Sequence, residues 1–194
     1  STTTRPVRAK KPTSIPPHFA TATSSTGTPT TGWRKVDTCL VRTDAAAVHS
    51  ARVYGFDLDS TLIVTASGRK FATSRADWQF LDSAVPDKLR QLHSDGYAIV
   101  IFSNQGGIAN KFYDEAKAHM ITGKIDDIIA SVGIPMLALV AATEDKCRKP
   151  STALWDLFVS GFNGGVEVNL ADCHYVGDAA GRVAGWRAGA PKDF

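Results

Sequence analysis

The chain has 194 residues, of which 43% are hydrophobic and 21% are charged. This is enough for one globular domain with a substantial core, and no apolar run approaches the ~20 residues that span a membrane, so we expect no membrane contact. The three cysteines are odd in number and form no Cys-x-x-Cys pair, which argues against a disulfide framework or a zinc cluster and favours a reducing compartment.

The net charge of +3 conceals an uneven distribution of charge along the chain. Residues 1–36 contain six basic residues and no acidic one, so residues 37–194 have a net charge of −3. An acidic body can supply metal ligands, but it is not a broad basic platform for nucleic acid. We therefore expect that any contact between the body and nucleic acid is local.

Residues 1–32 are rich in Ser, Thr and Pro and have almost no large apolar side chains. Such a segment cannot bury enough surface to offset its ordering entropy, so we predict a disordered arm before a folded domain over residues 33–194. A solvated linker is its simplest interpretation. The basic stretch 5–12 also suits nuclear import or contact with nucleic acid, and an acid-free start rich in Ser and Thr suits an organellar transit peptide. The arm is also the expected contact for repair proteins. These features favour a location in the nucleus or the mitochondrion.

The body alternates apolar strand patterns with amphipathic helix patterns. We predict strands at 39–42, 51–56, 97–102, 136–142 and 174–176, and helices at 86–95, around 121–132 and around 154–158. Pro150 suits the first turn of the last helix. Residues 60–77 are polar and contain Gly68, so we expect a loop or small hairpin over the site. The alternation predicts a Rossmann-like, doubly wound and mainly parallel α/β sheet.

Each of the four predicted parallel strands, which begin with 51–56, ends in polar residues. These are Asp57 and Asp59, Ser103 and Asn104, Arg148 and Lys149, and Asp178. Because the carboxyl ends of adjacent parallel strands lie together, we expect these side chains to meet at one site. Each group has an ordinary structural explanation, such as a turn or a helix cap, but four such groups at four strand ends favour a functional site.

Asp57 and Asp59 are spaced i and i+2, so both carboxylates can face the same site. Two carboxylates in one place repel each other unless a cation lies between them or one of them keeps a proton. Both arrangements are useful for phosphate chemistry. The four motifs together resemble those of the haloacid-dehalogenase phosphatase superfamily.

This resemblance implies a role for each motif. Asp57 is expected to be the nucleophile that forms an aspartyl-phosphate, and Asp59 the general acid that later acts as a base. Mg²⁺ is the expected cofactor, with Asp57, the backbone carbonyl of Asp59 and Asp178 as ligands. Ser103, Asn104 and Lys149 are expected to bind the phosphoryl group.

The resemblance narrows to the phosphatase domain of the polynucleotide kinase 3′-phosphatase family, over about residues 33–194. The matching positions are Phe71, Asp77-Trp78, Pro86, Leu89, Leu92, Gly96-Tyr97, Ile101-Phe102-Ser103-Asn104-Gln105, Arg148-Lys149-Pro150, Trp155, Tyr175-Val176-Gly177-Asp178-Ala179-Ala180-Gly181-Arg182, Trp186 and Lys192-Asp193-Phe194. Members of the family continue past this last run with another Asp-containing segment, so we expect that the domain is incomplete at residue 194. The resemblance implies a DNA 3′-phosphatase that acts on single-stranded ends or strand breaks and leaves 3′-OH ends for repair; we expect a monomer.

Three further residues are expected to contact the rest of the DNA strand. Arg148 is next to the predicted phosphate ligand, and Lys111 follows the Gly106–Gly107 turn at the rim of the site. Phe71 lies on the predicted flap, where an aromatic ring can stack on a base or pack the flap against the body. The two explanations for Phe71 have equal weight.

Two other functions stay open. Small-molecule phosphatases for histidinol phosphate or heptose bisphosphate share the Asn-Gln and Arg-Lys-Pro motifs, but they have a Cys/His zinc loop before the latter, and residues 143–147 contain one Cys and no His. A non-catalytic module that binds DNA breaks would be expected to lack the nucleophile, and Asp57 is present. The intervals between the motifs leave no room for a large cap domain, and an open site suits the end of a polymer.

Overall fold

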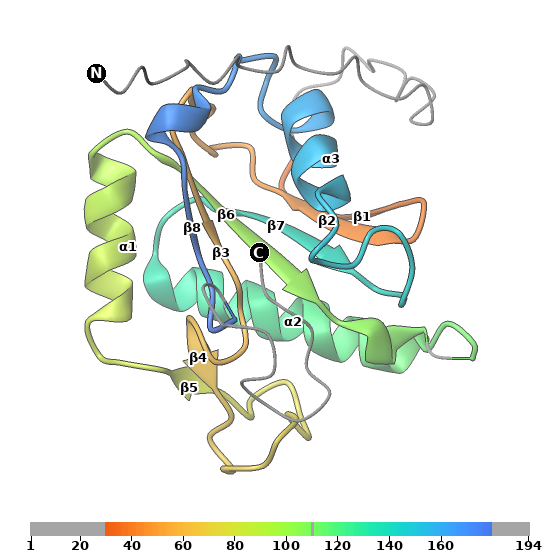
Figure 1. Cartoon of the computed structure of the whole chain (residues 1–194). Coiled ribbons are helices and arrows are strands. Elements are labelled where there is room, and N and C mark those ends of the chain that lie inside the picture. Colours follow the sequence, from red (N-terminus) through yellow and green to blue (C-terminus); the bar gives the residue numbers. More distant parts are fainter. Residues whose placement is uncertain (1–29, 110, 180–194) are drawn as a thin grey trace, which may run out of the picture.

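A computed structural model describes residues 30–109 and 111–179 of the chain (Figure 1). Its main sheet has six strands in the order β1-β2-β7-β6-β3-β8. These strands are β1 (Gly32–Val36), β2 (Cys39–Thr43), β3 (Val53–Phe56), β6 (Ala98–Asn104), β7 (Leu137–Ala141) and β8 (His174–Val176). The predicted arm up to residue 29 and the matching positions after Ala179 lie outside the described residues.

Helices and a small second sheet complete the described fold. The helices are α1 (Val85–Ser94), α2 (Glu115–Val132), α3 (Ala153–Gly161) and the short 3-10 turns η1 (Gly106–Ile108) and η2 (Leu170–Asp172), and β4 (Ile63–Val64) pairs with β5 (Gln79–Phe80). In the part of the chain that is described, no helix is both long and apolar enough to cross a membrane. The three cysteines are free thiols.

The sheet is mainly parallel, as predicted. β7, β6, β3 and β8 run parallel to their neighbours, and the hairpin β1–β2 adds two antiparallel strands beside β7. Strand β1 was not predicted, because Arg34 and Lys35 are exposed on this edge strand and leave no apolar pattern. It begins at Gly32, the last residue of the predicted arm.

The core has two layers, one on each face of the sheet. On one face, α1 and α2 pack their apolar stripes against side chains such as Ile99 and Ile101 of β6. On the other face, Phe158 of α3 packs against Val100 and Phe102 of the same strand. Helices on both faces make the sheet doubly wound, which confirms the predicted fold class (Figure 1).

The ends of the helices follow from local chemistry. The Asp114 side chain accepts a hydrogen bond from the Lys117 backbone N–H and caps α2, and Gly133 ends this helix in the left-handed conformation. The prediction for Pro150 was wrong. Helix α3 begins at Ala153, because a turn in which the Ser151 N–H bonds to the Arg148 carbonyl comes first.

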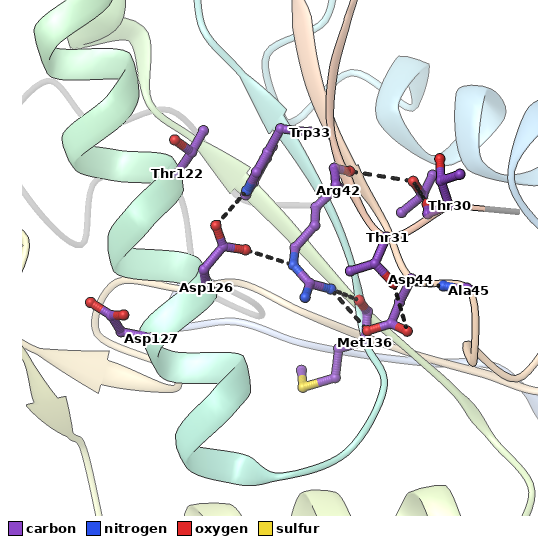
Figure 2. Close-up of polar contacts among 12 residues, drawn as sticks. Thr30, Thr31, Trp33, Arg42, Asp44, Ala45, Thr122, Asp126, Asp127 and Met136 are labelled. Atoms are coloured by element: carbon purple, nitrogen blue, oxygen red, sulfur yellow. Dashed lines mark hydrogen bonds and ion pairs between the residues drawn. The ribbon is translucent and has the colours of Figure 1, made fainter.

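One buried guanidinium joins the β1–β2 hairpin to α2 (Figure 2). The Arg42 side chain is 9% exposed, and its Nε lies 2.7 Å from Oδ1 of Asp126 on α2. Its Nη1 donates to the Asp44 carboxylate and to the Met136 carbonyl. The indole Nε1 of Trp33 on β1 donates to the other oxygen of Asp126 at 3.0 Å. The hairpin is thereby held against the core.

Residues 65–78 form the expected flap between β4 and β5. The Asp77 carboxylate accepts hydrogen bonds from the backbone N–H and the hydroxyl of both Ser67 and Thr73. These bonds, led by the one from the Thr73 N–H, lower the pKa of Asp77 from 3.8 to about 2. Arg75 of the flap forms a two-pronged ion pair with Asp127 of α2, at 2.6 and 2.5 Å. The hydrogen bonds of Asp77 thus hold the flap together, and the ion pair of Arg75 attaches it to α2.

Candidate active site

The expected site forms where β3, β6 and β8 end. Asp57 directly follows β3, and its backbone N–H donates to the Val176 carbonyl of β8 at 2.9 Å. Gly177 lies beside it, since a Cβ placed on Gly177 would be 3.6 Å from the Cβ of Asp57. The parallel pairing of β3 with both β6 and β8 therefore puts three strand ends next to one another.

Lys149 reaches into the centre of this site. Its Nζ lies 2.8 Å from Asp57 Oδ1, 2.6 Å from the Phe102 carbonyl oxygen and 2.8 Å from the Tyr175 hydroxyl. An ammonium has three protons to donate, and all three have acceptors here. Burial raises the pKa of Tyr175, so its hydroxyl keeps a proton that it can donate in turn. The result is a positive charge fixed beside the Asp57 carboxylate.

Asn104 holds the backbone that presents Lys149. Its side-chain Nδ2 donates to the Lys149 carbonyl at 3.0 Å, and its Oδ1 accepts from the Lys149 N–H at 2.9 Å. This paired contact ties the end of β6 to the loop after β7. Phosphate binding by Asn104 stays a prediction. In the structure, the Asn104 amide also positions the backbone of Lys149.

A second chain of contacts leads from β6 to Asp59. The Ser103 side chain is buried, and its Oγ accepts a hydrogen bond at 3.0 Å from Nε2 of Gln105. The same amide nitrogen donates to Asp59 Oδ2 at 2.6 Å. On the other side, the Nζ of Lys124 from α2 lies 3.4 Å from Asp59 Oδ1. Both oxygens of Asp59 therefore have a donor.

The oxygen atoms expected to bind the metal, at the ends of β3 and β8, are of the kind that suits a hard cation. The Asp178 backbone N–H donates to the Thr61 hydroxyl at 2.9 Å, which joins the residue after β8 to the loop that contains Asp57 and Asp59. Carboxylate and carbonyl oxygens are the ligands that Mg²⁺ prefers. Within residues 30–109 and 111–179, no group of three His, Cys, Asp or Glu residues is placed to hold a metal, but the expected set has only two carboxylates and one backbone carbonyl.

The three residues expected to contact DNA are at or near the surface. The Arg148 side chain is 41% exposed, next to Gly106 and 3.7 Å from Glu144. Phe71 is 73% exposed, so it does not pack the flap against the body, and Lys111 is exposed as well. Their part in substrate binding stays a prediction.

Four residues of the site had no predicted role in it: Thr61, Gln105, Lys124 and Tyr175. Gln105 and Tyr175 lie in two of the motifs that match the family. Lys124 had a signal of its own, because it interrupts the apolar stripe of α2 between Ile121 and Ile128. A charge in such a stripe is unusual, since lysine is rarely buried without a partner.

A family model described as "Polynucleotide kinase 3 phosphatase" matches residues 52–194 of the chain. Among curated proteins, the "Bifunctional polynucleotide phosphatase/kinase" of Schizosaccharomyces pombe is 37% identical over 150 residues, which cover 77% of this chain and 36% of that protein. The "Polynucleotide 3'-phosphatase ZDP" of Arabidopsis thaliana is 30% identical over 162 residues, or 77% of this chain and 23% of that protein. The chain thus spans about a third or less of these two relatives.

A viral relative is closer in length. The "Uncharacterized 20.8 kDa protein in FGF-VUBI intergenic region" of Autographa californica nuclear polyhedrosis virus is 34% identical over 143 residues, which cover 72% of this chain and 74% of that protein. Among solved structures, a putative HAD-like phosphatase from Mesorhizobium loti superposes with a TM-score of 0.57 at 16% identity, over 72% of this chain and 70% of that one. This match confirms the haloacid-dehalogenase type of fold.

Proposed function

Since the chain belongs to the polynucleotide kinase 3′-phosphatase family, we propose that it is a Mg²⁺-dependent DNA 3′-phosphatase that acts through an aspartyl-phosphate. The observation that supports this most directly is the placement of Lys149 against Asp57 at the end of β3. A carboxylate nucleophile needs a positive charge beside it, because both it and the phosphate are anionic. The family match supplies the substrate class, a 3′-phosphorylated end.

The proposed reaction has two steps. The Asp57 carboxylate attacks phosphorus, the bond between phosphorus and the 3′ oxygen breaks, and the leaving oxygen takes a proton from Asp59. Water then attacks the aspartyl-phosphate, gives a proton back to Asp59 and releases inorganic phosphate and free Asp57. Lys149 donates hydrogen bonds to the phosphoryl oxygens throughout, and Ser103 adds a further donor.

Lys149 already uses its three protons, so substrate binding must replace one of its acceptors. The Tyr175 hydroxyl is the most accessible of them, because Asp57 and Phe102 are less exposed than Tyr175. We therefore expect a phosphoryl oxygen to take that position, where the Tyr175 hydroxyl can also donate to it. Mg²⁺ held by Asp57, the Asp59 carbonyl and Asp178 would neutralise charge on the phosphate.

We further propose that the chain acts as a monomer on 3′-phosphate ends in the nucleus or the mitochondrion, and that its basic arm recruits repair proteins there. The arm supports this part of the proposal, because its four basic residues are separate from an acidic body.

The decisive experiment compares substrates with the full chain. Matched oligonucleotides with a 3′-phosphate or a 5′-phosphate, together with histidinol phosphate and heptose bisphosphate, are incubated with Mg²⁺, and released phosphate is measured. We expect release from the 3′-phosphate alone, its loss in EDTA and its return with added Mg²⁺. Preference for a small phosphate would instead favour a metabolic phosphatase, and the absence of turnover would favour a binding module.

A further inference from the structure

Lys124 is a charged residue in the otherwise apolar buried stripe of α2. Its side chain is only 4% exposed, and its apolar neighbours on the same face of the helix include Ile121, Ile125 and Ile128. Among the described residues, its ammonium has one polar partner, the Asp59 carboxylate at 3.4 Å. Arg75 of the flap crosses α2 at the preceding residue, Gly123.

Stability does not explain this arrangement. A buried ammonium loses much of its hydration, and replacing a buried ion pair with apolar side chains is often neutral or stabilising. The partner Asp59 is 52% exposed, so it would be hydrated without Lys124. A methionine at position 124 would extend the apolar stripe without a charge. The lysine is therefore better explained by what it does to Asp59.

We propose that Lys124 is a positioning residue, which holds the Asp59 carboxyl group in the orientation that lets it protonate the leaving oxygen. This inference rests on the proposed function of Asp59. Lys124 acts on Oδ1 from α2, and Gln105 acts on Oδ2 from the end of β6, at 3.4 and 2.6 Å. Two donors from two elements fix the plane of a carboxyl group that one donor would leave free to turn.

The two hydrogen bonds to Asp59 do not prevent its proton transfer. Each carboxyl oxygen has two lone pairs, so a donor at each oxygen leaves the second lone pair for the proton that Asp59 transfers. Lys124 keeps its own protons throughout and does not contact the phosphate. Its effect should therefore be confined to the two proton transfers of Asp59, and only the first of these depends on the leaving group.

The test uses Lys124→Met and leaving groups that differ in their need for a proton. A deoxyribose 3′ oxygen is a poor leaving group that needs protonation, whereas p-nitrophenolate leaves without it. Misplacing a catalytic group can cost ~100-fold, so we expect kcat/KM on the 3′-phosphorylated oligonucleotide, which reports the first step, to fall by ~10–100-fold. The loss of kcat/KM on p-nitrophenyl phosphate should be about ten times smaller. Lys88→Met, the same change at an exposed position of α1, is the matched control.

A double-mutant cycle tests whether Lys124 acts through Asp59. Once Asp59→Asn has removed the general acid, adding Lys124→Met should have no further effect on the oligonucleotide. Lys124→Arg keeps a donor and should restore much of the activity. Thermal unfolding shows whether each variant is folded, and Lys124→Gln takes the place of Lys124→Met in the same comparisons if the latter does not fold.

The results separate this inference from the proposed function. Equal losses on both substrates, no loss on either, or additive effects with Asp59→Asn would overturn the role of Lys124 and leave the phosphatase intact. If the wild-type chain ignores the oligonucleotide, the proposed substrate is wrong, and a series of aryl phosphates with increasingly poor leaving groups still decides the role of Lys124. A steeper dependence on the leaving group in Lys124→Met would support it.

Discussion

The ammonium of Lys149 lies 2.8 Å from Oδ1 of Asp57, although the two residues are 92 positions apart in the chain. Both side chains are 21% exposed, so water screens this pair less than it would a surface pair. The contact places the positive charge where a phosphate must arrive and keeps Asp57 oriented before it does. The site is thus organised by contacts within the chain itself.

Asp57→Asn tests the nucleophile. The amide cannot form an aspartyl-phosphate, so we expect 3′-phosphatase activity to fall by at least ~10⁴-fold. The fold should persist, because Lys149 keeps the Phe102 carbonyl and the Tyr175 hydroxyl as acceptors. Released phosphate and circular dichroism measure the two effects, and Asp172→Asn on η2 is the control. Activity near the wild-type level in Asp57→Asn would refute covalent catalysis by this residue.

Much of this site was predictable, because its main residues come directly after strands that the sequence identifies clearly. Strands β3 and β6 are apolar runs, and their parallel pairing brings the strand ends that carry Asp57 and Ser103 to the same edge of the sheet. The polar residues at the strand ends then predict a functional site, and the resemblance of the four motifs to the haloacid-dehalogenase superfamily predicts a phosphatase. The family match supports the same conclusion independently of the geometry.

Other parts depend on contacts that no local pattern encodes. The Asn104 amide bonds to the backbone of a residue 45 positions away, and Lys124 reaches Asp59 from a helix on one face of the sheet. Strand β1 was missed because its exposed Arg34 and Lys35 resemble a polar loop. The placement of α3 after Pro150, and not around it, depends on a turn of the preceding loop.

Asp77 should make the flap sensitive to acid. Its pKa is lowered to about 2, so its contribution to stability is complete above pH 4 and is lost as the pH falls towards 2. Asp77→Asn should loosen the flap at neutral pH, because the amide cannot accept all four hydrogen bonds. Hydrogen–deuterium exchange of residues 65–78 should therefore be faster in the variant.

The pH dependence provides a sharper form of this test. The difference in exchange between wild type and Asp77→Asn should shrink between pH 4 and pH 2, after correction for the intrinsic rate. Asp87→Asn on α1, whose carboxylate is 82% exposed, should behave like wild type. A difference that stays constant across this window would show that the ionisation of Asp77 does not hold the flap.

We expect that removing one member of the Arg42 network destabilises the protein more than replacing the whole network with uncharged side chains. Asp126→Ala removes one acceptor from a guanidinium that is 9% exposed and the acceptor of the Trp33 indole. We expect the free energy of unfolding to fall by ~2 kcal/mol, less than for a fully buried pair because Asp126 is 40% exposed. Adding Arg42→Met together with Asp44→Asn should recover part of this loss, since neither the guanidinium nor the Asp44 carboxylate, which is 15% exposed, is then left buried without its partner. Urea denaturation measures both, and additive losses would argue against the burial of an incompletely paired charge.

The rim of the site should distinguish DNA from a small phosphate. Arg148, which directly precedes Lys149, and Phe71 on the flap are exposed, so we expect both to be available to the strand beyond the phosphate. Loss of one base-stacking contact costs ~1–3 kcal/mol, so Phe71→Ala should lower kcat/KM on a 3′-phosphorylated oligonucleotide by about tenfold or more. Arg148→Ala should have a similar effect, which weakens with added salt.

Lys149 provides the contrast to these rim residues, because it touches the reacting group and not the strand. Lys149→Ala should lower kcat on the oligonucleotide and on p-nitrophenyl phosphate alike, by ~10²–10³-fold. Lys146→Ala and Leu170→Ala are exposed controls for the rim variants and should leave both substrates unaffected. If Arg148→Ala and Phe71→Ala instead reduce turnover of both substrates equally, these residues support the site and do not read the DNA strand. Because the body is acidic outside the arm, a rim of few basic residues is the part of it that we expect to select a polymer end.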